Sequence, residues 1–142
     1  MDNQIINRMG FMMEQALGSM TSSLAAGFRE KGIDLPHSQY VVLRLIYVSK
    51  EPLTQIKIAE ILKKDAAAIK RTVDILQRKG LVERQAQSGR SNYVVATDKA
   101  LELKETITET ANRTLHELFG EFSDEELTAF TNMLGRIAGA KG

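Results

Sequence analysis

The side chains of this sequence that are best suited to chemistry are basic ones, and they gather in the middle of the chain. Residues 50–90 hold ten Lys and Arg against five Asp and Glu, whereas the remaining residues hold nine bases and thirteen acids. A basic segment between acidic flanks is typical of a lobe that binds a polyanion. The solvated face of a lysine-rich helix would carry the same charge, so both interpretations stay open on charge alone. The ten bases are Lys50, Lys57, Lys63, Lys64, Lys70, Arg71, Arg78, Lys79, Arg84 and Arg90.

Residue combinations typical of enzymes and metal centres do not occur in the sequence. It has no cysteine and two histidines, His37 and His116, which excludes a disulfide framework, a thiol nucleophile and a thiolate metal site. The patterns H-E-x-x-H, G-x-x-x-x-G-K-S/T and G-x-S-x-G are absent as well. We therefore expect no enzyme activity, no metal site and no cofactor.

Length and composition indicate one ordinary globular domain. The chain has 142 residues, of which 43% are hydrophobic and 26% are charged, as in average soluble proteins. No run approaches about eighteen apolar residues, so we expect no membrane-spanning helix. The first residues, Met1 to Gln4, lack the basic region and apolar core of a secretory signal. These features predict a cytosolic protein.

Two short helices are predicted around the basic residues. Thr54 is a good N-cap residue for a helix that ends at Leu62, and apolar residues recur at helical spacing within that helix. After a break, Asp65 can cap a second helix over 66–79. Gly80 is then expected to stop that helix.

A hairpin is predicted directly after the second helix. Strand-like residues occupy 81–85 and 92–97, and a glycine-containing turn occupies 87–91. Helix, short break, helix and hairpin follow one another in a winged helix-turn-helix. This arrangement suits DNA, because a helix fits the major groove and a basic hairpin can reach the backbone or the minor groove.

Long helices are predicted on both sides of this lobe. Apolar residues recur at spacings of three and four over 3–30, after Thr97, which can act as an N-cap, and after a capping box that begins at Ser123. A further helix, apolar on several sides and therefore buried, lies between Pro36 and Pro52. The outer helices are too long for one small lobe to cover, so we expect them to pair with a second copy of the chain.

Several short motifs over about residues 30–140 follow one family pattern. They are Leu35, Gln39, Tyr40 and Leu43; Leu53, Thr54, Gln55 and Ala59; residues 65–71, Leu76 and Lys79; Gly80, Leu81, Val82, Glu83 and Arg84; and Thr97, Asp98, Lys99 and Ala100. The block from Gly80 to Arg84 is the most specific of them. Together these residues resemble the MarR-family transcriptional regulators.

The resemblance implies a mainly helical fold with a small hairpin wing. Residues 35–97 would form the winged DNA-binding lobe, and residues 1–34 and 98–142 would form the dimerisation helices. The implied protein is a homodimer that binds double-stranded DNA at a palindromic operator, most commonly as a repressor. A small aromatic or phenolic effector often releases such a protein from DNA.

The resemblance also implies which residues contact DNA, and the sequence departs from the family at some of them. Ala67 and Ala68 stand where the family has serine and threonine hydroxyls, and Lys70 stands where it often has threonine. Ser88 replaces the aspartate that orients the wing arginine, which is Arg90 here. The expected DNA contacts are Thr54, Gln55, Ala66, Ala67, Ala68, Lys70, Arg71, Arg90 and Asn92.

Two further expectations concern other residues. We expect Arg84 to hold the wing in place rather than to contact DNA. Soft, aromatic and polar side chains between the terminal helices and the lobe predict an effector pocket, although the same residues could equally form the core between the two parts. They are Met12, Met13, Phe28, His37, Tyr40 and Arg44. The alternative function is a winged-helix module that binds protein and not DNA, which would need no cationic reading face.

Overall fold

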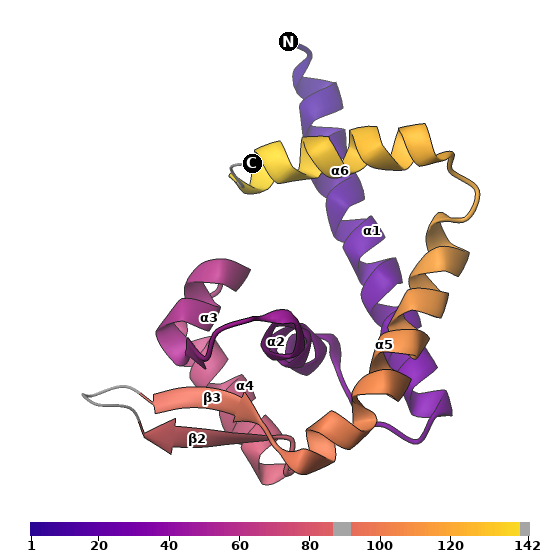
Figure 1. The fold of residues 1–142 in the computed structure, drawn as a ribbon. Helices are drawn as coiled ribbons and strands as arrows, with labels where there is room; N and C mark the ends of the chain where they lie inside the picture. Colours follow the sequence, from indigo (N-terminus) through magenta and orange to yellow (C-terminus); the bar gives the residue numbers. More distant parts are fainter. Residues whose placement is uncertain (87–91, 140–142) are drawn as a thin grey trace.

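Six helices and three short strands make up the described part of the chain, which is residues 1–86 and 92–139 of a computed structural model. A small lobe of helices and strands lies to one side of the long terminal helices (Figure 1). The mainly helical winged helix-turn-helix fold that the sequence predicts is therefore confirmed. In chain order the elements are α1 (Asn3–Glu30), α2 (His37–Val48), β1 (Leu53–Thr54), α3 (Gln55–Leu62), α4 (Ala66–Arg78), β2 (Val82–Ala86), β3 (Asn92–Ala96), α5 (Asp98–Phe119) and α6 (Asp124–Ala138).

The two helices of the helix-turn-helix begin and end where local hydrogen bonds dictate. Thr54 Oγ1 accepts the backbone N–H of Lys57 at 3.2 Å, which caps α3. Asp65 Oδ1 accepts that of Ala68 at 2.7 Å, which caps α4. Each bond satisfies a helix-end donor that has no partner within the helix. Gly80 ends α4 with a φ of 76°, a conformation that glycine adopts without a steric penalty.

The wing belongs to an antiparallel sheet with the strand order β1-β3-β2. Val82 pairs with Ala96, so the predicted hairpin is confirmed to within one residue at its strand ends. β1 pairs Leu53 with Val94 and is not predicted, because two residues cannot show an alternating pattern. The predicted turn at 87–91 lies outside the described residues.

The core of the lobe fixes α3 and α4 against the sheet. Leu43 of α2, Ile58 of α3, Val73 and Leu76 of α4 and Val94 of β3 are each at most 1% exposed. Burial of one such side chain contributes about 1.5–3 kcal/mol to stability. These buried residues of α3 and α4 hold the basic side chains of the two helices on the outside. Ile61, which the helical spacing also places in the buried stripe of α3, is instead 43% exposed.

The central helix α2 joins the lobe to α5. Pro36 is its N-cap residue, one position before the helix, and the helix ends at Val48, earlier than the predicted stop at Pro52. Near this end the Tyr47 phenol donates a hydrogen bond of 2.5 Å to the backbone carbonyl of Ala100. This bond ties the last turn of α2 to the first turn of α5.

The C-terminal half of α1 packs along α5. Leu24 and Phe28 of α1 and Ile107 of α5 are buried where the two helices meet. Gly27 lies so close to α5 that a Cβ atom there would be 3.0 Å from the Thr114 hydroxyl oxygen. Glycine therefore permits a helix contact that a larger residue would push apart.

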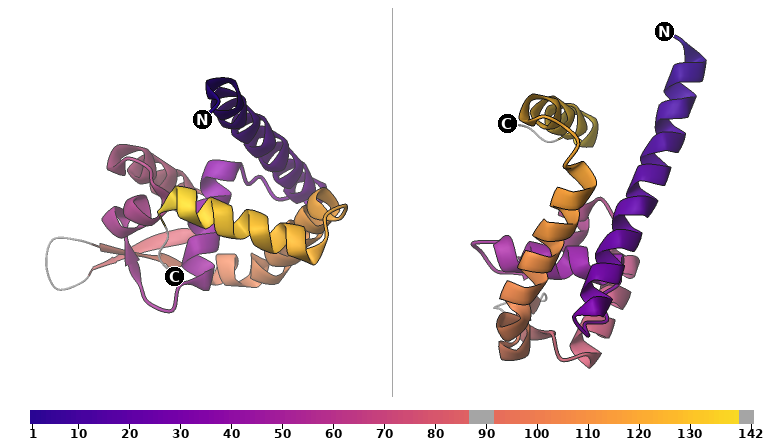
Figure 2. Two further views of the ribbon diagram at one scale, coloured as in Figure 1. Left: turned by 90° about the horizontal axis from the view of Figure 1, so that it is seen from above. Right: turned by 90° about the vertical axis from the view of Figure 1, so that its right-hand side faces the viewer.

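The N-terminal half of α1 and the whole of α6 project away from the lobe (Figures 1 and 2). No residue of α6 is buried, although the helix carries the apolar side chains of Phe130, Met133, Leu134 and Ile137. None of the described helices has an apolar stretch long enough to cross a membrane. The exposed apolar residues in the first half of α1 are Ile5, Ile6, Met9, Phe11, Met12, Met13 and Leu17.

Candidate nucleic-acid interface

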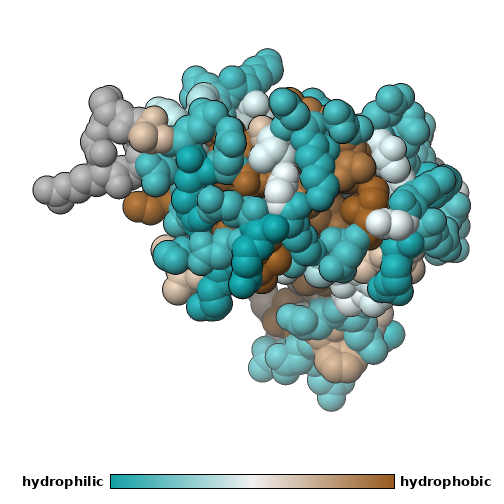
Figure 3. Space-filling view, turned by 90° about the horizontal axis from the view of Figure 1, so that it is seen from below, coloured by the Kyte–Doolittle hydropathy of each residue, from teal (hydrophilic) through white to brown (hydrophobic). Residues whose placement is uncertain are grey.

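The first turns of α4 present a basic, sterically open surface. Ala66, Ala67, Lys70 and Arg71 are exposed, whereas Ile69, one residue before Lys70, is buried in the core of the lobe. Small methyl groups beside two cations leave room for a bulky, negatively charged partner to approach the helix. Hydrophilic side chains also cover most of the underside of the winged lobe, with hydrophobic residues between them (Figure 3).

Arg84 of β2 joins three side chains next to this surface. Its Nε and Nη2 donate to Gln55 Oε1 at 2.8 and 2.5 Å, and Nη2 also donates to Asp74 Oδ1 at 2.7 Å. Its Nη1 donates to the side-chain oxygen of Gln77. One guanidinium thus connects the wing to α3 and α4, which agrees with the structural role expected for Arg84.

Asp74 lies between two cations. Its Oδ2 is 3.1 Å from Lys70 Nζ, one helical turn away, while its Oδ1 accepts from Arg84. Hydrogen bonds from Lys70 and then from Arg84 lower the pKa of Asp74 below its usual value. The carboxylate is therefore charged at neutral pH and holds Lys70 along the helix.

The sequence does not predict the roles of Asp74 and Gln77. The spacing of four residues between Lys70 and Asp74 is a visible helix-pair signal. No comparable signal joins Arg84 to Gln55, because these residues are 29 positions apart and meet only through the fold.

The other predicted DNA contacts are spread over α3, α4 and the wing. Thr54 is half-buried and acts as the N-cap of α3, and Ala68 is half-buried in the first turn of α4. Asn92 is exposed at the start of β3. Arg90 and Ser88 lie outside the described residues.

The predicted effector residues separate into two groups. Phe28 and Tyr40 are core residues with ring centroids 5.0 Å apart, and the His37 ring is 6.3 Å from Tyr40. Met12 and Met13 are instead 47% and 45% exposed on the projecting half of α1. Met12 is sixteen residues from Phe28, which corresponds to about 24 Å along the helix. The prediction of one pocket lined by all six residues is therefore wrong for the single chain.

The group around Tyr40 has polar atoms in an apolar setting. Burial raises the pKa of Tyr40, an effect that Arg44 partly offsets through its charge and a hydrogen bond. Burial, and then the charge of Lys64, lower the pKa of His37. The Nδ1 atom of His37 is buried, and no hydrogen-bond partner for it lies within residues 1–86 and 92–139.

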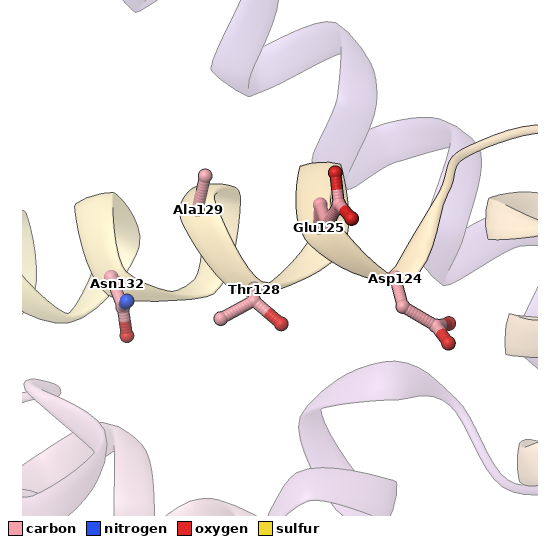
Figure 4. A pocket seen from close by; sticks show the side chains of 5 residues that line it. All are labelled: Asp124, Glu125, Thr128, Ala129 and Asn132. Carbon is pink, nitrogen blue, oxygen red and sulfur yellow. The ribbon is translucent and has the colours of Figure 1, made fainter.

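Hollows on the surface lie elsewhere. One follows α6 and is lined by residues of that helix alone (Figure 4). Glu125 and Ala129 point to one side of the helix and Asp124, Thr128 and Asn132 to the other, so their side chains do not converge on one point. A second hollow lies between α1 and α5. Neither contains a predicted effector residue. The second is lined by Ser23, Ala26, Gly27, Glu30, Lys31, Arg113, Thr114 and Glu117.

Proteins of known structure share this arrangement of helices and wing. The model of the MarR family matches residues 35–89, which confirms the resemblance in the winged lobe. A MarR-family transcriptional regulator from Rhodococcus sp. RHA1 is 21% identical with a TM-score of 0.83, and 96% of each chain is covered.

Two further solved structures carry a bound partner. MepR from S. aureus, in a complex with DNA, is 19% identical with a TM-score of 0.80, over 93% of this chain and 97% of that one. CouR from Rhodococcus jostii RHA1, bound to p-coumaroyl-CoA, is 22% identical with a TM-score of 0.79, over 92% and 91%. These likenesses show that the fold is shared over nearly the whole chain.

Proposed function

We propose that this chain, which carries the MarR-family winged helix in residues 35–89, is a transcriptional regulator that binds specific sites on double-stranded DNA. The observation that supports this best is the first part of α4, where Lys70 and Arg71 are exposed while Ile69 is buried. A helix displayed in this way fits the major groove of DNA. The function is one of binding, not of catalysis.

Each residue of the surface has a distinct role in this proposal. Arg71 reads the edge of a guanine, because its planar fork matches the N7 and O6 acceptors. Lys70 contacts a phosphate as a point charge. The methyl groups of Ala67 and Ala68 meet a thymine methyl.

The remaining predicted contacts flank the reading helix. The Thr54 hydroxyl and the Gln55 amide contact the DNA backbone at the start of α3. The small side chain of Ala66 leaves room beside Lys70 for the DNA strand. From the wing, Arg90 and Asn92 reach the backbone or the minor groove.

The proposed active form is a homodimer. The exposed apolar residues of α1 and α6 match what a two-fold interface would cover. Residues 1–34 and 98–142 would then be the dimerisation part and residues 35–97 the DNA-binding lobe. Two reading helices related by a two-fold axis would bind a palindromic operator whose half-sites are about 34 Å apart.

We further propose that the protein is a repressor that a small aromatic or phenolic effector releases. The p-coumaroyl-CoA bound to CouR supports an aromatic class of ligand. Phe28, His37, Tyr40 and Arg44 supply aromatic and polar groups near the junction of lobe and terminal helices. The effector acts only through a higher affinity for the dimer whose reading helices are wrongly spaced. Titration with salicylate-like compounds should shift both operator binding and thermal stability.

Selection of bound DNA from a random pool, followed by sequencing, tests the proposed function. We expect an enriched palindrome and an affinity that falls steeply with salt. The log–log slope should be on the order of −5, because Lys70, Arg71 and Arg90 of two subunits supply six cations. A protein-interaction module would enrich no sequence and, because it needs no cationic reading face, would not be retained on heparin.

A further inference from the structure

We propose that Arg84 is a positioning residue for DNA binding, which takes up the acceptor oxygens beside the reading helix so that the groups left for DNA are donors. This inference rests on the proposed function. Phosphates and the purine N7 and O6 atoms are hydrogen-bond acceptors. An acceptor oxygen turned toward them would be left unpaired or would repel them.

Arg84 holds one acceptor from α3 and two from α4. These are the side-chain oxygen of Gln55, that of Gln77 and Oδ1 of Asp74. The side chain of Arg84 is 21% exposed and that of Asp74 is 40% exposed. The network therefore lies at the edge of the lobe, next to the proposed DNA surface and not in its core.

The orientation of the Gln55 amide follows from the chemistry of Arg84. A guanidinium has five N–H donors and no acceptor, so the amide atom that faces it must be the oxygen. Both Nε and Nη2 donate to that oxygen. The Gln55 amide nitrogen, with two donors, remains for DNA. Gln55 is thereby suited to a phosphate oxygen or a purine acceptor, and not to a donor such as cytosine N4.

The charge of Lys70 also depends on Arg84. Asp74 shares its two oxygens between Lys70 and Arg84, so the three side chains together carry one positive charge. Without Arg84, Lys70 and Asp74 would form a neutral pair. Lys70 would then have to leave a carboxylate with no other partner in order to reach a phosphate. Arg84 thus weakens the hold of Asp74 on Lys70.

A set of variants tests this by the sign of their effects. Binding to a labelled mixed-sequence duplex of about 30 base pairs is measured by anisotropy over a range of NaCl concentrations. We expect Arg84→Met to weaken binding about tenfold. The log–log salt slope should also become less steep, by roughly 1 for the Lys70 of each subunit. Asp74→Asn should bind more tightly than the wild type, because Lys70 loses the carboxylate that holds it. The double variant Arg84→Met, Asp74→Asn should bind the duplex with an affinity within about threefold of that of the wild type.

Matched variants separate this role from fold maintenance and from overall charge. Arg84→Lys keeps the charge but loses the fork, so it should still bind about threefold more weakly than the wild type. Glu60→Gln removes an acid on α3 that faces Lys57 at 3.5 Å and should change affinity less than Asp74→Asn does. Circular dichroism confirms that each variant is folded. If Arg84→Met does not fold, Arg84→Lys and Asp74→Asn decide.

Three results would overturn the inference while the proposed function stands. They are an equal loss of affinity in Arg84→Met and Asp74→Asn, wild-type affinity in Arg84→Lys, and a gain in Glu60→Gln as large as that in Asp74→Asn. A wild-type protein that shows no salt-dependent binding to the duplex would instead overturn the proposed function.

Discussion

Lys70 and Arg71 are neighbours in the sequence but differ in their partners. Lys70 is paired with Asp74, whereas Arg71 has no salt bridge within the described part of the chain. We expect Arg71→Ala to reduce the free energy of operator binding by about 1–3 kcal/mol and to relax the preference at one base pair. Lys70→Ala should weaken binding to all sequences alike, because a phosphate contact carries no sequence information. Competition between the selected site and its point variants measures both effects.

An exposed basic residue outside the lobe provides the control for these substitutions. Arg113 lies on α5, so Arg113→Ala should retain the affinity and the specificity of the wild type. Wild-type affinity in the Lys70/Arg71 double alanine variant would contradict the assignment of α4 as the reading helix.

Ionisation of Tyr47 should lower the stability of the fold at alkaline pH. Burial raises the pKa of Tyr47 to about 12, while the unfolded phenol titrates near pH 10. A folded-state pKa above the unfolded value means that this stabilisation is complete below about pH 10 and is lost as the pH rises toward 12. The phenolate can no longer donate to the Ala100 carbonyl. Unfolding free energy should therefore fall between these pH values.

The variant Tyr47→Phe isolates this contribution. It should lose about 1 kcal/mol of unfolding free energy at neutral pH, because the Ala100 carbonyl loses its side-chain donor. Its unfolding free energy should then decrease less than that of the wild type above about pH 10. Urea unfolding followed by circular dichroism at a series of pH values measures both. Parallel decreases in the two proteins would show that other groups cause the alkaline loss.

At the scale of the elements, the N-cap of α4 links stability to DNA binding. Asp65→Ala removes the acceptor that lies 2.7 Å from the Ala68 N–H. We expect a loss of about 1 kcal/mol in unfolding free energy and weaker DNA binding, because the N-terminal end of α4, which presents Lys70, frays. Thermal unfolding and anisotropy measure the two effects.

Asp65→Asn is the matched control, because asparagine is an equally good N-cap residue. It should stay close to wild-type stability and bind DNA at least as well, since it also removes a negative charge. A loss of stability in Asp65→Asn equal to that in Asp65→Ala would show that the charge and not the cap matters.

The elements also show why the sequence predicts some features and not others. The sequence predicts the starts of α3, α4, α5 and α6, because each cap bond spans three residues, as in Thr97 with Ala100 and Ser123 with Glu126. Such bonds depend on local sequence alone. The joining of Arg84 to Gln55 and the pairing of β1 depend on distant segments. The separation of Met12 from Phe28 follows from their distance along α1, which residue type alone does not give.

At the scale of the whole molecule, the exposed apolar faces of α1 and α6 support the proposed dimer. Phe130 is 45% exposed and Ile137 is 62% exposed on a helix without a buried residue. Apolar patches of this extent mark interfaces in soluble proteins. We expect sedimentation to show a species of twice the 15.8 kDa chain mass at micromolar concentration.

Charged residues in this face should divide the dimer without unfolding the lobe. The double variant Phe130→Asp, Ile137→Asp should sediment as a monomer, because two buried carboxylates facing their symmetry copies would be unpaired. Its lobe should keep the core formed around Leu43 and Val73, and thus its circular dichroism. With one reading helix in place of two, the log–log salt slope of DNA binding should fall from on the order of −5 to roughly half that value.

The control for this variant places one carboxylate on an exposed apolar residue outside α6. Val48, at the end of α2, is 55% exposed, so Val48→Asp should remain a dimer with the wild-type salt slope. A stable wild-type monomer at micromolar concentration would defeat the dimer outright. A dimeric double variant would place the interface on α1 alone, whose projecting half carries exposed apolar residues from Ile5 to Leu17. Leu17→Asp would then be the variant that separates the subunits.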